Sequence, residues 1–163
     1  MVINNNTLYV TDILLQKILA CPIDPTTGVL GTCAYIQMTE EGETPIGLAI
    51  NGDYLYITAF KPSVIIITDF NPSEVASGVY KCPLATLATS GTTSPCELTG
   101  ASHLNGPYDL AFPDDGFVYI TNLDSINDGK AVTRCTTGDL GPCEVSLNFQ
   151  PSRAAGIVFP PQA

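Results

Sequence analysis

Residues 45–58 read PIGLAINGDYLYIT, two short apolar runs separated by the polar turn Asn51-Gly52-Asp53. Asn, Gly and Asp favour the tight turns that join antiparallel strands, whereas β-branched and aromatic residues favour the strands themselves. The stretch therefore predicts a β-hairpin. The pattern returns at residues 107–121, where PYDLAF comes before a Pro-Asp-Asp-Gly turn and FVYIT comes after it.

The hairpin is part of a longer repeat. Residues 8–11, LYVT, are a third copy of the second run, and residues 154–160, AAGIVFP, are a third copy of the first. In each unit a segment that ends in Cys comes next, followed by a turn that contains Gly and by a second Cys. Units of four short antiparallel strands, about 45–60 residues long, are typical of β-propeller blades.

The sequence thus predicts an all-β, propeller-like protein with about three four-stranded antiparallel blades. We expect a single repeat domain over residues 1–163, with blade-like units at approximately 1–40, 45–103 and 107–150 and a terminal strand at 154–160. No copy of the PIGLAI-type run precedes Leu8. We therefore expect the first blade to lack its opening strand.

Composition excludes several classes of function. Six basic and sixteen acidic residues give a net charge of −10, and phosphate binding needs Lys and Arg, so we expect no nucleic-acid partner. No apolar run approaches the roughly 18 residues of a membrane span, so we expect no membrane insertion. Charged residues make up only 13% of the chain, against about 25% in typical soluble domains. Such a surface favours a secreted or tightly assembled protein, placed outside the cell or at its surface.

The six cysteines fall at equivalent places in the repeat, one pair in each unit: Cys21 and Cys33, Cys82 and Cys96, Cys135 and Cys143. Adjacent antiparallel strands bring Cα atoms within the 7 Å or so that a disulfide needs. Zinc sites favour shorter spacing between cysteines and usually combine two such pairs, and the chain has one His, so the metal alternative is disfavoured. The sequence favours three local disulfides and an oxidising compartment.

Two motifs carry a resemblance to a known family. Pro-x-Gly-Leu-Ala-Ile precedes Leu-Tyr-Ile-Thr, and Pro-Tyr-Asp-Leu-Ala-Phe precedes Val-Tyr-Ile-Thr-Asn. With these motifs the chain resembles bacterial-type β-propellers of the NHL and lactonase-like kind, and the Cys pair in each unit resembles a secreted subgroup. The resemblance spans nearly the whole chain and implies an architecture, because propellers host enzymes, lectins and binding platforms alike.

Three blades are fewer than the four to eight of a single-ring propeller. The C-terminal run Gly156, Ile157, Val158 and Phe159 matches the opening strands of the other units, and the first unit lacks one. We therefore expect this run to pair with Leu8, Tyr9 and Val10 of another chain. Exchange between two chains would close a six-blade ring, and donation to a next chain would give a fibre. The third alternative is that the chain is part of a longer protein.

The sequence contains no convergent catalytic group. His103 is the only histidine and lies in a loop-like segment, and the acidic clusters at residues 114–116 and 124–129 have the composition of turns. Asp109 alone stands where lactonase-like propellers hold a metal with several ligands. We expect no enzyme activity, no cofactor and no metal site.

Two further features concern ligands. Tyr9, Tyr56 and Tyr119 recur at one position of the repeat. A ring of exposed tyrosines would bind sugars, but repetition in every unit favours packing between blades. Asn5-Asn6-Thr7 is an N-glycosylation sequon at Asn5. The sequence predicts a non-enzymatic extracellular structural subunit that self-associates through its terminal strands as a fibre or oligomer. The alternatives are a carbohydrate- or protein-binding module such as an adhesin or lectin and, less favoured, a lactonase-like hydrolase.

Overall fold

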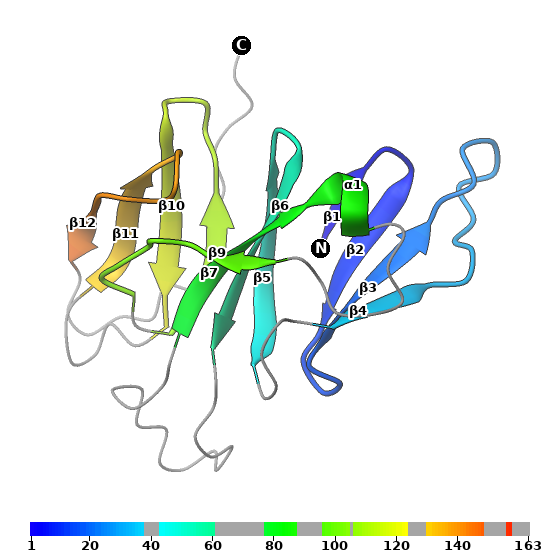
Figure 1. The fold of residues 1–163 in the computed structure, drawn as a ribbon, viewed down its shortest axis with the longest axis horizontal. Helices are drawn as coiled ribbons and strands as arrows, with labels where there is room; N and C mark the ends of the chain where they lie inside the picture. Colours follow the sequence, from blue (N-terminus) through cyan, green and yellow to red (C-terminus); the bar gives the residue numbers. More distant parts are fainter. Residues whose placement is uncertain are drawn as a thin grey trace.

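The computed structural model describes residues 1–37, 43–60, 77–87, 96–104, 106–123, 130–148 and 156–157. Within these residues the chain forms three four-stranded antiparallel sheets and one short helix, α1 (Leu84–Leu87). The sheets lie side by side, with β5–β8 in the middle (Figure 1). The predicted all-β class and the three four-stranded sheets are confirmed.

Each sheet is built from consecutive strands. The first sheet contains β1 (Val2–Asn4), β2 (Thr7–Asp12), β3 (Lys17–Pro22) and β4 (Ala34–Gln37). The second contains β5 (Thr44–Asn51), β6 (Tyr54–Phe60), β7 (Ser77–Pro83) and β8 (Glu97–Leu98). The third contains β9 (Pro107–Ala111), β10 (Phe117–Asn122), β11 (Lys130–Thr136) and β12 (Cys143–Asn148). Within each sheet every strand pairs with its neighbours in the chain, as the predicted four-stranded antiparallel units require.

The turns between the first two strands of each sheet have the predicted chemistry. Asn5 and Asn6 both adopt positive φ, at 43° and 60°, between β1 and β2. Gly52 does so at 57° between β5 and β6, and Gly116 at 85° between β9 and β10. Positive φ suits Asn and Gly. The first two connections are two-residue turns, which match the twist of an antiparallel pair, whereas residues 112–116 connect β9 and β10.

The first sheet has its own opening strand, so the expectation that it lacks one is wrong. Val2 pairs with Tyr9 and Ile3 pairs with Leu8. The sequence signal was missed because β1 is only three residues long and carries no copy of the PIGLAI-type run. Since β1 already occupies this edge of β2, a strand from another chain would have to displace it to pair with the residues of the predicted assembly strand.

The C-terminal run is described only in part. Gly156 and Ile157 lie outside any strand, and the N–H of Ile157 donates a hydrogen bond to Asp109 Oδ2 at 3.3 Å. Val158 and Phe159 lie outside the described residues. The start of this run therefore lies beside β9 of its own chain.

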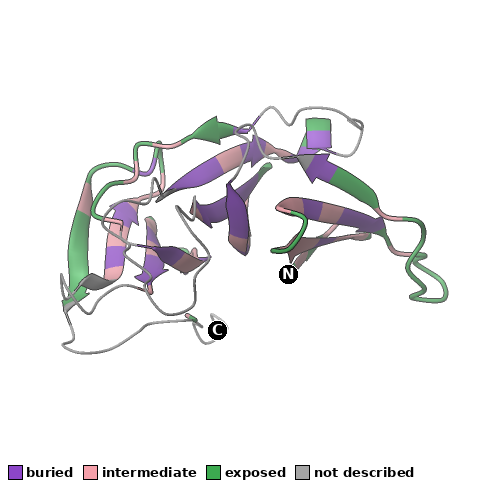
Figure 2. Ribbon diagram, turned by 90° about the horizontal axis from the view of Figure 1, so that it is seen from below, coloured by how far each residue is buried: buried purple, intermediate pink, exposed green. Residues whose placement is uncertain are grey.

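The second sheet packs against both of its neighbours, and it is the most buried of the three (Figure 2). One of its faces, with Leu55 and Ile57, forms a core cluster with Tyr9 and Ile18 of the first sheet. Side chains alternate between the faces of a strand. The opposite face packs on the third sheet in a second cluster, which contains Tyr56, Val79, Leu110, Val118 and Ile120.

Each sheet holds one disulfide, and the three bonds are the predicted pairs: Cys21–Cys33, Cys82–Cys96 and Cys135–Cys143. The Cα atoms of the pairs are 4.1 to 4.2 Å apart, because each bond joins the third strand of its sheet to the fourth strand or to the turn before it. Three disulfides indicate an oxidising environment for folding. Over the described residues, no helix has the length and apolar character to cross a membrane.

Candidate assembly surfaces

One hydrogen bond recurs at both boundaries between sheets, in addition to the apolar packing. The hydroxyl of Thr11 in the first sheet donates to the carbonyl oxygen of Ile46 in the second at 3.0 Å. The hydroxyl of Thr58 in the second sheet donates to the carbonyl oxygen of Tyr108 in the third at 2.9 Å. Both threonines stand two residues after the repeated tyrosine, and both acceptors follow the proline that begins the opening run. The two boundaries thus have equivalent geometry.

Among the described residues, the matching threonine of the third sheet, Thr121, makes no such bond to another sheet. Thr121 accepts a hydrogen bond from the N–H of Asp109 at 3.0 Å and donates to the carbonyl oxygen of the same residue at 3.3 Å. Both partners belong to the third sheet itself. This side of the third sheet has the donor of the repeated boundary without a following four-stranded sheet in the described structure.

The repeated tyrosines follow the same order. Tyr9 and Tyr56 are only 3% and 2% exposed, each beneath the opening strand of the next sheet. Ile50 packs against the cluster that contains Tyr9, and the ring of Phe112 lies 4.7 Å from the ring of Tyr56. Burial raises the pKa of both tyrosines. The packing interpretation is confirmed for these two residues, whereas Tyr119 lies on the far side of the third sheet and is partly exposed.

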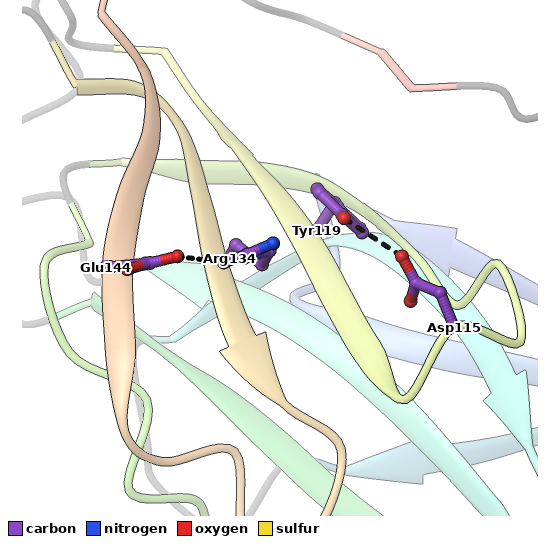
Figure 3. Close-up of polar contacts among 4 residues, drawn as sticks. All are labelled: Asp115, Tyr119, Arg134 and Glu144. Carbon is purple, nitrogen blue, oxygen red and sulfur yellow. Dashed lines mark hydrogen bonds and ion pairs between the residues drawn. The ribbon is translucent and has the colours of Figure 1, made fainter.

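We call the outward side of the third sheet the third-sheet face. The cross-strand register places Tyr119, Arg134 and Glu144 in one row on it. The Tyr119 hydroxyl donates to Asp115 Oδ2 at 2.9 Å, and Arg134 forms an ion pair with Glu144 (Figure 3). The Arg134 guanidinium also lies 4.3 Å from the centre of the Phe117 ring. Hydrogen bonds to Glu144 and then to Tyr119 raise the pKa of Arg134 above its ordinary value.

The second sheet carries the same row, and there its tyrosine is buried while Lys81 is partly buried and Glu97 is exposed. Tyr56, Lys81 and Glu97 are aligned by register, and Lys81 Nζ lies 4.3 Å from the centre of the Tyr54 ring. Tyr54, Lys81 and Glu97 line a cleft of about 390 Å³ together with Asp139, which comes from the turn between β11 and β12 of the third sheet. An acidic turn of the next sheet therefore lies across the basic row.

The equivalent hollow on the third-sheet face is smaller, about 210 Å³, and its lining residues all belong to the third sheet and its β11–β12 turn. Phe117, Arg134 and Glu144 correspond in register to Tyr54, Lys81 and Glu97. Each hollow thus has a wall formed by equivalent residues of its own sheet. The wall that Asp139 supplies to the first has no counterpart among the residues that line the second.

The outward side of the first sheet, which we call the first-sheet face, is apolar. Alternation along the strands turns Ile3, Leu8, Val10, Leu19 and Tyr35 away from the second sheet. Ile3 is 65% exposed and Tyr35 is 48% exposed, and Leu8, Val10 and Leu19 are partly exposed.

The residues that match this face elsewhere are buried. Leu55 and Ile57 of the second sheet, and Val118 and Ile120 of the third, correspond to Leu8 and Val10, and all four are 0% exposed. In those sheets the preceding sheet covers them. The first-sheet face is therefore a boundary surface that the described structure leaves in contact with solvent.

The other candidate residues are placed as follows. Asn5 lies exposed in the β1–β2 turn, and its glycosylation stays a prediction. His103 adopts φ of 58°, and its carbonyl oxygen accepts a hydrogen bond from Thr133. Asp109 lines a hollow of about 460 Å³ with Gly47, Ile157 and the residues beside them. Across the described parts of the chain, no cluster of three or more His, Cys, Asp or Glu is suited to hold a metal ion. The acidic segment 124–129 lies outside the described residues.

Sequence reasoning missed the row on the third-sheet face, because its members come from three strands and meet only through register. The available signal was the recurrence of Tyr, a basic residue and Glu in the second and third units. No protein-family model, curated protein or solved structure matches the chain. What can be inferred about function therefore comes from the sheets, the disulfides and the two end faces.

Proposed function

We propose that this chain is a non-enzymatic extracellular structural subunit, a propeller-like protein of the NHL and lactonase-like kind that self-associates into an oligomer or fibre. The observation that carries the proposal is the pair of end faces. Each corresponds to one side of a boundary that the chain builds twice internally, between its first and second sheets and between its second and third.

The free energy gained by burying the apolar side chains of the first-sheet face supports association. Fully burying one exposed Leu, Ile or Val side chain contributes about 1.5–3 kcal/mol. Three of the four aliphatic residues of the first-sheet face are already partly buried, so the four together contribute at most roughly 6–12 kcal/mol. Association costs an estimated 4–15 kcal/mol in lost freedom of motion. The two terms are similar in size, so the surplus is small. We expect assembly that depends on protein concentration.

The route of self-association differs from the one that the sequence predicted. Because β1 already pairs with Thr7, Leu8 and Tyr9, we propose contact between sheet faces in place of strand exchange. The low content of charged residues and the three disulfides support an extracellular subunit.

Sedimentation velocity on the oxidised chain tests the proposal. We expect the weight-average mass to rise with concentration, and negative-stain electron microscopy to show rings or filaments. The oxidised state is checked by mass, because three disulfides remove six hydrogens. A chain that stays monomeric up to roughly 100 µM, where an interface of about 5.5 kcal/mol would be half occupied, overturns the proposal.

A further inference from the structure

We propose that the turn between β2 and β3 contacts the surface of an uncharged lipid bilayer. Its apolar tip, by which we mean Ile13, Leu14 and Leu15, enters the headgroup region of one leaflet. The inference goes beyond the proposed function and does not depend on self-association.

The apolar tip is the most exposed run of apolar residues that the structure describes. Ile13 and Leu15 are each 51% exposed, and Leu14 is 94% exposed. Single exposed apolar residues are common on protein surfaces and need no explanation. Three consecutive aliphatic side chains that leave half or more of their surface to water are different, because such a patch is typical of a contact with a partner or a membrane.

The shape of the tip favours lipid over a folded protein. Residues 13–16 form the turn between Asp12, the last residue of β2, and Lys17, the first residue of β3, at the lower end of the first sheet in Figure 1. A folded partner would need a hollow of matching shape to bury a protruding turn, whereas lipids rearrange around it. Interfacial helices bury their apolar face about 5–10 Å deep in the bilayer, and two or three residues of a hairpin reach that depth.

The polar groups beside the tip are held by the protein. The N–H of Leu15 donates a hydrogen bond to Asp12 Oδ1 at 2.9 Å, and main-chain groups without a partner are costly in lipid. The side-chain amide of Gln16 donates to Thr44 Oγ1 at 3.5 Å, toward the second sheet. The surface that the turn presents is therefore aliphatic.

The nearest cation is also directed away from the tip. Lys17 Nζ lies 5.5 Å from the centre of the Tyr35 ring. Tyr35 pairs with Leu19, which is two residues farther from the turn than Lys17. Lys and Tyr are typical of the zone between lipid and water, where their apolar parts enter the membrane and their polar ends stay hydrated.

The charge of the chain determines the class of lipid. Anionic lipids attract clusters of Lys and Arg, whereas this chain has a net charge of −10 and Lys17 is the one basic residue beside the tip. We therefore expect a neutral surface, such as phosphatidylcholine. A tip of three residues reaches one leaflet and does not span the bilayer, so this contact is distinct from the insertion that the lack of a long apolar run argues against.

Binding by one tip is weak. A single myristoyl chain binds bilayers with an association constant of about 10⁴ M⁻¹. The three side chains are shorter than such a chain and are already partly buried, so we expect a smaller constant. Binding should be reversible and should need lipid at about 1 mM or more.

Vesicle flotation of the oxidised full-length chain tests the contact. We expect the parent to float with phosphatidylcholine vesicles, and Leu14→Asp to lower the partition constant by roughly tenfold or more, because burial of one Leu side chain is lost. Val29→Asp is the matched control, because Val29 is 64% exposed and lies in the β3–β4 connection at the other end of β3. It should bind as the parent does. Peptide mapping of the three disulfides verifies that both variants fold.

Fluorescence locates the contact on the chain. The chain contains no Trp, so Leu14→Trp and Val29→Trp each supply a single reporter. We expect phosphatidylcholine vesicles to shift the emission of Leu14→Trp to the blue and to leave that of Val29→Trp unchanged. Replacing part of the lipid by anionic phosphatidylglycerol should weaken binding, because the protein and the surface then carry charge of the same sign.

The outcomes that overturn the inference are specific. The parent fails to bind the vesicles, Leu14→Asp binds as well as the parent, the two reporters shift equally, or anionic vesicles bind more tightly than neutral ones. A blue shift of Leu14→Trp that grows with protein concentration without lipid would assign the tip to another protein chain, and it also overturns the lipid contact. Self-association through the sheet faces is measured without lipid, so either proposal can fail alone.

Discussion

The side-chain hydroxyl of Thr58 donates a hydrogen bond to the main-chain carbonyl oxygen of Tyr108 across the boundary between two sheets, at 2.9 Å. The Thr58 hydroxyl oxygen also accepts a hydrogen bond from the N–H of Gly47 at 2.8 Å. One fully buried side chain thus satisfies main-chain groups of two opening strands at once. The boundary between the second and third sheets is therefore specified by polar geometry as well as by apolar packing.

Replacing Thr58 tests that role. Thr58→Val keeps the shape but leaves the N–H of Gly47 and the carbonyl of Tyr108 without this partner in a buried place, so we expect a loss of about 3 kcal/mol in the free energy of unfolding. Thr58→Ser keeps the hydroxyl and should cost about 1 kcal/mol for the lost methyl group. Urea unfolding of the oxidised variants measures both. Equal losses would show that the hydroxyl contributes nothing.

Gly47 is needed for the close approach of the second and third sheets. A Cβ at this position would meet the carbonyl oxygen of Tyr108 and come within 2.9 Å of Asp109 Cα. Both are main-chain atoms, so we expect Gly47→Ala to destabilise the fold by about 1–3 kcal/mol or more.

The matched control for that variant is Gly138→Ala. No atom lies within 4 Å of the added Cβ at Gly138, so we expect a change within about 0.5 kcal/mol. Thermal unfolding of the two variants side by side gives the comparison. A Gly47→Ala variant as stable as Gly138→Ala would contradict the close contact of the two opening strands.

Burial of Tyr9 predicts a dependence of stability on alkaline pH. Burial raises its pKa above the ordinary value of 10.0. Below pH 10 the folded and unfolded chains both keep the proton. Between pH 10 and the pKa in the folded protein only the unfolded chain loses it, so the free energy of unfolding falls as the pH rises.

Tyr9→Phe removes this contribution. We expect the free energy of unfolding of the variant to fall less steeply above pH 10 than that of the parent, as measured by urea unfolding at several pH values. The comparison of slopes is unaffected by any constant loss of stability in the variant. Parallel pH profiles would contradict burial of the Tyr9 hydroxyl in the folded chain.

The sequence predicted the parts of the fold that have local chemistry. The turns at Asn5-Asn6 and Gly52 need positive φ, and the presence of Asn and Gly at these positions predicts that conformation. The pairing of Cys82 with Cys96, and of the other two pairs, followed from equal positions in the repeat. The opening strand Val2–Asn4 was missed because three residues give too short an alternation to detect.

The candidate site was harder to predict, because it depends on register between strands. Tyr119 and Arg134 are fifteen positions apart in the sequence, and they are neighbours only because Phe117 pairs with Thr136 at the end of the hairpin. Which face of a sheet remains exposed to solvent also depends on the number and order of the sheets. The sequence of a single strand does not determine that number or order.

The local disulfides bear on the synthesis of the chain. Each bond spans 8 to 14 positions and closes within one sheet. During synthesis the N-terminus emerges first, so Cys21 and Cys33 are exposed well before Cys82. If oxidation is as fast as synthesis, the first disulfide forms before any other cysteine is available to pair. Of the 15 pairings open to six cysteines at once, emergence in order would then leave one choice at each step. We expect oxidative folding during synthesis to need little disulfide reshuffling, and refolding of the reduced full-length chain to need more.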